Sequence, residues 1–274
     1  MSDETALVKP SGNGDPVKGL SSYLNARQKN LAMFDASRVK PETLIRLALY
    51  EFAHNEWLRR CTPESIYGSL ILAAQIGLEP SGIRGEAYLV PFKGRCQLIP
   101  GWRGLVKLAL RSKAVRSLYS HLVYDRDECR IWLGSEPRVE HSPYLDGDRG
   151  VVRAAYAVAH MDNGMIDIEP MTIDELQKIK EHALKQRGGK EGAYAEWEDQ
   201  MLRKAPIRRL AKRLPLGEDF YAAVRADDLA ATGEQQQMII DIDPSAATEQ
   251  REANDSINDR LADRAAAVRN GGAS

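Results

Sequence analysis

Apolar residues recur at intervals of three and four in the first third of the chain, which is the spacing of helices with one buried face. This pattern predicts helices at Leu20–Phe34, Pro41–Arg59 and Pro63–Ile76. Thr62, before the third helix, is a favoured N-cap residue, and Gly77, after it, suits the left-handed conformation of a C-terminal cap. We expect these helices to form scaffold rather than a binding site.

Short apolar runs bounded by turn residues predict antiparallel strands through the middle of the chain. Lys93-Gly94 and Asn163-Gly164 each separate two such runs, and an Asn-Gly pair is the strongest short signal for a β-hairpin. Pro137–Gly150 is polar and predicts a loop. The predicted strands are Glu86–Phe92, Arg95–Pro100, Val115–Tyr124, Glu128–Leu133, Val151–Met161 and Met165–Met171.

Helical spacing returns after the first hairpin and again after the second. It predicts a helix at Gly101–Ser112, one that the Thr172–Glu175 capping box opens and that runs to about Gln186, and a long one from about Tyr194. A flexible basic loop, Arg187–Lys190, separates the last two. Hairpins combined with helices predict an α+β fold, with an antiparallel hairpin-built sheet packed by helices.

Basic residues are concentrated in Gly77–Arg116, which holds eight Lys or Arg residues against two acids, although the net charge of the whole chain is −1. Within this stretch Arg103, Lys107 and Arg111 are spaced four residues apart and form one face of the predicted helix. A basic face is often only solvated. Because no acid lies among these cations at helical spacing, we favour contact with a polyanion.

A second basic helix is predicted at Arg203–Leu214, which holds six Lys or Arg residues and no acid. Lys204, Arg208 and Lys212 form a stripe at four-residue spacing. Pro206 interrupts the pattern, since a proline inside a helix removes a hydrogen bond and costs about 3 kcal/mol unless the helix kinks. We therefore expect a break near Ala205.

The pattern GLEP…GEAYLVPF…QLIPGWRGLVKLALRS resembles the RecT family of phage single-strand annealing proteins, which are related in role to Redβ-type recombinases. A second similar block lies near Trp197–Pro215, so the resemblance covers about Leu20 to Pro215, with Pro206 as a departure from it. The resemblance implies an ATP-independent protein that binds single-stranded DNA and anneals it in homologous recombination of phage or prophage DNA. It also implies a homo-oligomer, as a ring or helical filament, with a phage exonuclease and the host single-strand binding protein as partners.

The two basic helices have a common explanation if both line one positively charged groove that holds a phosphate backbone, because Lys and Arg bind phosphates without reading sequence. Trp102 is a candidate for stacking on a base. Base edges would stay open for a second strand, so annealed duplex DNA is a ligand too. The candidate DNA-binding residues are Arg84, Lys93, Arg95, Gln97, Trp102, Arg103, Lys107, Arg111, Lys113, Arg116, Arg203, Lys204, Arg208, Arg209, Lys212 and Arg213.

Two other functions stay open at this point. One is a protein that coats single strands without annealing them. The other is a Mg²⁺-dependent nuclease that uses Asp125, Asp127 and Glu128, although these residues also suit a turn between two strands. The sequence has no G-x-x-x-x-G-K-[ST] motif and no histidine or cysteine spacing for a metal, so we expect no required cofactor, with Mg²⁺ at most a counterion.

Charge is divided unevenly along the 274 residues. Residues 217–274 hold twelve acids and five Arg, a balance of −7, so residues 1–216 carry +6. We expect a disordered segment at 1–19, a DNA-binding core at 20–216, and a weakly folded acidic tail at 217–274 that either contacts partners or only solubilises. Three scattered cysteines, no apolar N-terminal segment and no apolar run of about eighteen residues predict a cytoplasmic protein with no membrane contact, and the family resemblance implies that the cell is a bacterial host.

Overall fold

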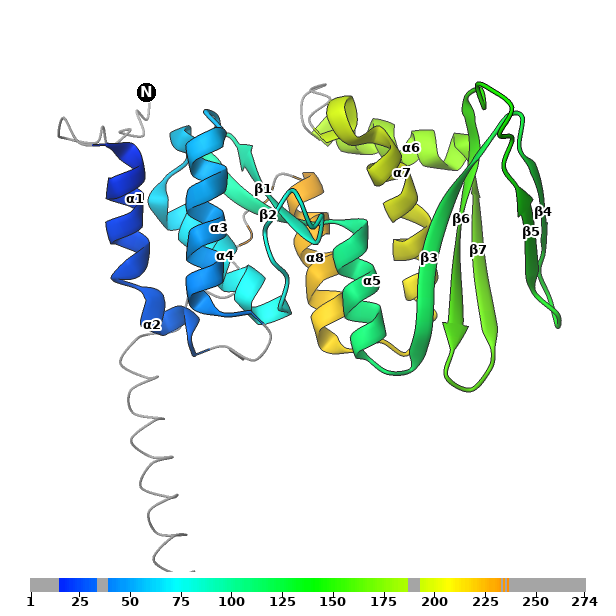
Figure 1. Cartoon of the computed structure of the whole chain (residues 1–274), viewed down its shortest axis with the longest axis horizontal. Coiled ribbons are helices and arrows are strands. Elements are labelled where there is room, and N and C mark those ends of the chain that lie inside the picture. Colours follow the sequence, from blue (N-terminus) through cyan, green and yellow to red (C-terminus); the bar gives the residue numbers. More distant parts are fainter. Residues whose placement is uncertain (1–14, 34–38, 187–192, 233, 235, 237–274) are drawn as a thin grey trace, which may run out of the picture. The chain divides into compact units, whose positions relative to one another are not determined.

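Helices that pack against one another form the first part of the computed structural model (Figure 1). The structure describes residues 15–33, 39–186, 193–232, 234 and 236. Within them, α3 packs on α1, α2 and α4. The elements are α1 (Pro16–Asn25), α2 (Gln28–Leu31), α3 (Pro41–His54), the 3₁₀ turn η1 (Leu58–Arg60) and α4 (Pro63–Ile76).

Local hydrogen bonds move two of the predicted boundaries. The first predicted helix, Leu20–Phe34, is divided in the structure into α1 and α2. Helix α1 begins at Pro16 rather than Leu20, because the Asp15 side chain accepts from the Val17 N–H at 3.0 Å and caps it. The second ends at His54, because Asn55 is extended and its side chain accepts from the next turn. Of the segment 1–19 predicted to be disordered, residues 16–19 belong to α1, and residues 1–14 lie outside the described residues.

The third helix confirms its predicted caps. The Thr62 side chain accepts from the Ser65 N–H at 3.3 Å, and Gly77 has φ 69°. Ten of the 14 residues of α4 are buried, so this helix lies at the centre of the N-terminal core.

The hairpin predicted around Lys93-Gly94 is present as β1 (Ala87–Phe92) and β2 (Arg95–Pro100). Both turn residues have positive φ, 47° and 76°, as a two-residue hairpin turn of this type requires. Strand β2 is buried except at Arg95, because α4 and α8 (Glu218–Thr232) both pack on it.

A three-stranded antiparallel sheet follows, in the order β3-β6-β7, and it confirms the second hairpin. Its strands are β3 (Val115–Tyr124), β6 (Val152–Met161) and β7 (Ile166–Thr172). Helix α5 (Trp102–Arg111) connects the first hairpin to this sheet, and α6 (Ile173–Gln186) and α7 (Ala193–Ala211) cover one face (Figure 1). The core on that face contains Leu122, Ala155, Met171, Leu176 and Leu202.

The opposite face of this sheet is covered by a hairpin that the sequence predicted only in part. Its first strand, β4 (Glu128–Trp132), was expected, but β5 (Arg138–Ser142) lies in the segment predicted to be a loop, so that prediction was wrong. Val139 packs with Val123 and Tyr156 across the sheet. A single half-buried valine among polar residues gives almost no alternating signal, so the strand depends on its tertiary contacts.

Helix α7 continues from Ala193 to Ala211 through Pro206, so the break expected near Ala205 does not occur. The capping box before α6 is confirmed, since the Thr172 N–H donates to the Glu175 carboxylate at 2.9 Å and the Glu175 N–H donates to the Thr172 hydroxyl at 3.4 Å. The basic loop 187–190 lies outside the described residues.

Residues 218–232, which the sequence assigned to the acidic tail, form α8 within the folded unit. Phe220, Ala223 and Ala226 are buried, and the unit extends to Gln236. The remaining tail, 237–274, lies outside the described residues. Hairpins and helices together confirm the α+β class.

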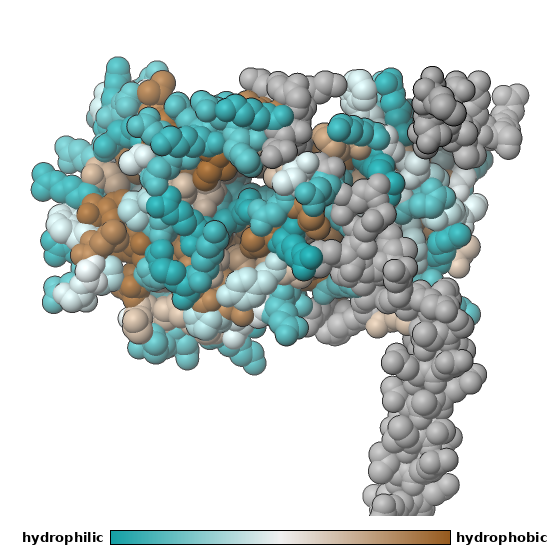
Figure 2. Space-filling model, turned by 180° about the vertical axis from the view of Figure 1, so that it is seen from behind, coloured by the Kyte–Doolittle hydropathy of each residue, from teal (hydrophilic) through white to brown (hydrophobic). Residues whose placement is uncertain are grey.

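The surface shown in Figure 2 mixes hydrophilic residues with separate apolar patches. None of the described helices combines the length and the apolar character that a membrane-spanning segment needs.

Candidate nucleic-acid interface

The turn of the first hairpin presents two cations to solvent. Lys93 and Arg95 are exposed, and neither forms an ion pair with another described residue. The Lys93 ammonium lies 5.2 Å from the ring centroid of Phe92. The Gly94 carbonyl accepts from the Thr62 N–H at 3.2 Å, so the turn is held against the start of α4.

The start of α5 presses its backbone against the loop before β1. A Cβ atom on Gly101 would lie 2.2 Å from the Gly85 carbonyl oxygen, and one on Gly104 would lie 2.0 Å from the Glu86 carbonyl oxygen. The Gly101 N–H already donates to the Glu86 carbonyl at 2.9 Å. These glycines therefore serve a close contact between two backbone segments.

Arg103 is the exposed cation at this contact. Its guanidinium carbon lies 5.6 Å from the ring centroid of Trp102, and it forms no ion pair with a described residue. The Trp102 indole N–H donates to the Gln200 side chain, which links α5 to α7. Trp102 is half-buried, so only part of its ring faces solvent.

Glu86 neutralises the other cations of this region. The Lys107 ammonium lies 2.6 Å from its carboxylate, and Arg84 lies 3.3 Å from Glu79 and 3.9 Å from Glu86. Both acids of the Gly77–Arg116 stretch are thus used in ion pairs with its cations. Lys107 is half-buried, whereas Arg84 is mostly exposed.

Arg111 and Gln97 are held inside the fold. Arg111 donates to the carbonyls of Ile76 and Gly77 at 3.0 and 3.1 Å, which caps the end of α4, and to Asp219 at 3.2 Å. Gln97 is buried, and its side-chain N–H donates to the Glu234 carbonyl at 3.1 Å. Its side-chain oxygen has no partner among the described residues.

Two cations that follow α5, Lys113 and Arg116, are exposed. Lys113, with φ 60°, forms no ion pair with a described residue, and Arg116 lies 3.2 Å from Asp162 on the surface. Such an exposed pair is worth little and leaves Arg116 accessible.

Several cations in α7 and just after its end at Ala211 face acids on three other elements. Arg209 lies 2.7 Å from Glu169 and 2.6 Å from Glu175, and Arg213 lies 2.9 Å from Asp167. Arg203 donates to the Ser120 carbonyl at 3.2 Å. Lys212 is exposed and forms no ion pair with a described residue.

Lys204 is buried at the contact between α7 and α8. Its ammonium is hydrogen-bonded to Asp227, which also accepts from Arg208 at 2.8 Å, and Arg208 pairs with Asp228 as well. Burial lowers the pKa of Lys204, and the Asp227 carboxylate opposes that shift. In this arrangement the ammonium does not reach solvent.

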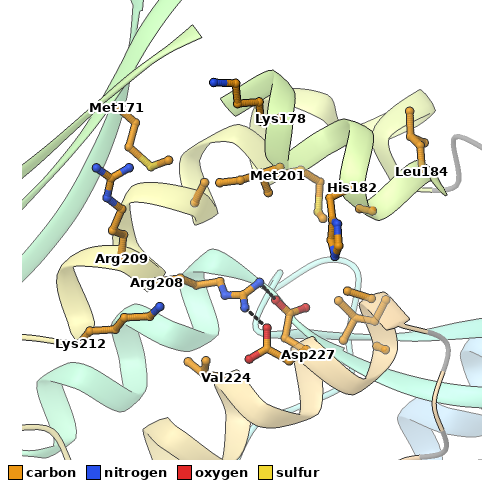
Figure 3. A pocket seen from close by; sticks show the side chains of 17 residues that line it. Met171, Lys178, His182, Leu184, Met201, Arg208, Arg209, Lys212, Val224 and Asp227 are labelled. Carbon is orange, nitrogen blue, oxygen red and sulfur yellow. Dashed lines mark hydrogen bonds and ion pairs between the residues drawn. The ribbon is translucent and has the colours of Figure 1, made fainter. Parts of the chain in front are cut away.

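The α7 cations line a pocket with a volume of about 470 Å³ between α6, α7 and α8 (Figure 3). Arg208, Arg209 and Lys212 lie at its wall, with Arg208 directed at Asp227. Much of the lining is apolar, including Met171, Ile179, Leu184, Met201 and Val224. No cation of the hairpin or of α5 lines it, so this pocket does not join the two basic helices, although α5 and α7 pack on each other.

Asp127, a residue of the nuclease alternative, holds the turn between β3 and β4. Its buried carboxylate accepts from the N–H groups of Tyr124 and Tyr144 at 2.8 and 3.0 Å, and from Arg149 at 3.0 Å, with His141 at 3.2 Å. Burial works to raise the pKa of Asp127, and these donors outweigh it and hold the pKa well below its usual range. No group of acids, histidines or cysteines among the described residues is placed to hold a metal ion.

Sequence reasoning missed the acids that neutralise α7. They are separated from their partners by between 19 and 46 residues and lie on β7, α6 and α8. No local pattern reports such distant pairs. The exposed Trp57 beside Arg60 was also overlooked, although an aromatic residue among cations is a signal that a sequence can give.

The chain is similar in sequence to a known protein family and to one of its members. Residues 42–241 match the RecT family. The chain is 30% identical over 236 residues to "Protein RecT" of Escherichia coli (strain K12), which covers 81% of this chain and 86% of that protein. The matched region includes the hairpin, α5, the β3-β6-β7 sheet, α7 and α8. The chain therefore belongs to the RecT family of recombination and annealing proteins.

Proposed function

We propose that this protein binds single-stranded DNA through its phosphates and anneals complementary strands without ATP, in recombination of phage or prophage DNA in the bacterial cytoplasm. Family membership supports the annealing class. The observation that carries the proposal is that five of the candidate DNA-binding residues are exposed cations without an ion pair to a described residue. They are Lys93, Arg95, Arg103, Lys113 and Lys212.

The ion-paired cations have a different part in this proposal. Lys204, Arg208, Arg209 and Arg213 hold α7 against its neighbours, and Lys107 and Arg111 hold α5. The first candidates for contact with DNA phosphates are the cations that have no such partner. The second group of candidates is Arg84, Arg116 and Arg203, since each has a partner but also some access to solvent.

The annealing step requires that the protein leave the base edges of the bound strand free to pair. Contacts to phosphate neutralise the repulsion between two strands and read no base. Watson–Crick pairing then selects the partner strand, with Mg²⁺ only as a counterion. The oligomer, the phage exonuclease and the host single-strand binding protein remain part of the proposal through the family resemblance.

The test uses complementary labelled oligonucleotides without nucleotide, with and without Mg²⁺. We expect faster pairing and intact strands. Binding without faster pairing would show a coating protein, and shortened strands would show a nuclease.

A matched pair of variants tests the phosphate contact. Arg103→Ala should weaken binding to every sequence about equally and lower the slope of log K against log salt by about one unit. Arg138→Ala is the control. Arg138 lies on β5 and is also exposed, and its guanidinium carbon is 4.2 Å from the ring centroid of Trp132. Equal effects of the two variants would contradict a specific contact at Arg103.

A further inference from the structure

Trp57 is an exposed indole on a rigid turn. Its side chain is 65% exposed, while its neighbour Leu58 is fully buried. The Asn55 side chain accepts from the N–H groups of Trp57 and Leu58 at 3.0 and 3.1 Å. These bonds hold the backbone of the turn, and the indole on it is exposed although burying it would be favourable.

Arg60 lies over this ring. Its guanidinium carbon is 4.4 Å from the ring centroid, and it forms no ion pair with another described residue. Arg59 differs, because it donates to the carbonyls of Phe52 and Ala53 and closes the end of α3. One arginine of the pair thus has a structural role, and the other has its charge available at the surface.

The turn also lies beside the tip of the first hairpin. The 3₁₀ turn η1 packs along β1, and the Thr62 N–H donates to the Gly94 carbonyl at 3.2 Å. Lys93 and Arg95 flank that glycine. The turn that carries Trp57 and Arg60 and the hairpin tip that carries Lys93 and Arg95 thus contact each other, and Glu56 is the acid next to Trp57 in sequence.

We propose that Trp57 is a base-stacking position for single-stranded DNA, with Arg60, Lys93 and Arg95 holding the phosphates beside it. This inference rests on the proposed function. An indole offers a flat face to any base, so stacking tolerates every sequence. Stacking also uses the face of a base and leaves its Watson–Crick edge open, which is what an annealing protein needs.

The experiment compares the full chain with Trp57→Ala and Trp57→Phe at one salt concentration. Each binds an oligo(dT) and an abasic deoxyribose-phosphate strand of the same length. Trp57→Ala should weaken oligo(dT) binding by about tenfold, and Trp57→Phe should recover most of it. Binding of the abasic strand should be unchanged in both. Tyr221→Ala, which removes another exposed aromatic ring on α8, is the control and should leave both ligands unaffected.

Three results would overturn the inference. They are no loss with Trp57→Ala, an equal loss for both strands, and a change in oligomer size on sedimentation with unchanged binding per protomer, which would make Trp57 a protein contact. The proposed function fails separately, if the unsubstituted chain neither binds nor anneals single strands. Unsubstituted binding with an unaffected Trp57→Ala variant would reject the stacking position alone.

Discussion

Replacing Asp127 with asparagine removes a charge on which four neighbours depend. Tyr124 and Tyr144 donate backbone N–H groups to this carboxylate, and Arg149 and His141 contact it through their side chains. An asparagine keeps one acceptor oxygen but places an NH₂ group where the other donors point. The turn between β3 and β4 and the segment 144–149 should therefore lose their common anchor.

The magnitude follows from burial. Removing one partner of a buried ion pair costs about 3–5 kcal/mol. The Asp127 side chain has no exposed surface, but Arg149 is 32% exposed and can turn to water. We therefore expect the lower end, about 3 kcal/mol of unfolding free energy at pH 7, measured by urea denaturation.

The pH dependence has a definite sign. The folded pKa of Asp127 lies below its unfolded value, so the contribution is present above about pH 4 and is lost as pH falls through the folded pKa. The difference in stability between the native chain and Asp127→Asn should therefore shrink in acid. Unfolding at pH 7 and again well below pH 4 measures this change.

Asp125→Asn is the matched control, because Asp125 is exposed in the same turn. It should change the unfolding free energy by less than about 0.5 kcal/mol. A loss below about 1 kcal/mol for Asp127→Asn would refute the anchoring argument. The nuclease would instead be supported if the native chain shortened DNA with Mg²⁺ and a stably folded Asp127→Asn variant did not.

Three further changes test the packing around the basic helices. Gly104→Ala should cost about 2 kcal/mol or more, because its Cβ would lie 2.0 Å from the Glu86 carbonyl oxygen, whereas Gly19→Ala, with nothing within 4 Å, should cost nothing; thermal unfolding compares them. Lys204→Ala should cost about 3 kcal/mol in urea unfolding because it leaves Asp227 short of a buried partner, and a cost as small as that of Lys212→Ala would contradict this. Thr172→Ala should lower stability by about 1 kcal/mol through loss of the capping box, and an unchanged melting temperature would show that the cap is unimportant.

Local signals predicted much of this fold. Thr62 and Gly77 fixed the ends of α4, and Lys93-Gly94 fixed the first hairpin, because each acts through bonds to near neighbours. Strand β5 was missed since its one apolar residue, Val139, gains its burial from other strands. Pro206 was expected to break α7, yet it is buried within a continuous helix.

The candidate site was less accessible to sequence reasoning. Helical spacing placed Lys204, Arg208 and Lys212 on one stripe, but it could not show which acids face them. Asp227 lies 23 residues beyond Lys204 in the chain, and only the folded α8 brings it there. Charge patterns therefore identified the basic helices, but they did not identify which cations lack an acidic partner and can contact phosphate.

The contact between β2 and the end of the folded unit bears on how the chain folds during synthesis. The Leu98 N–H donates to the Gln236 side chain at 2.8 Å, and the same side chain donates back to the Leu98 carbonyl at 2.7 Å, across 138 residues. At ribosomal rates that distance takes roughly 10 s to translate. During that time the outer edge of the nascent first hairpin lacks its final partner, and an unpaired strand edge invites pairing with other chains. The edge of β2 should therefore be open to chaperones, and to pairing with other chains, until Gln236 has been made.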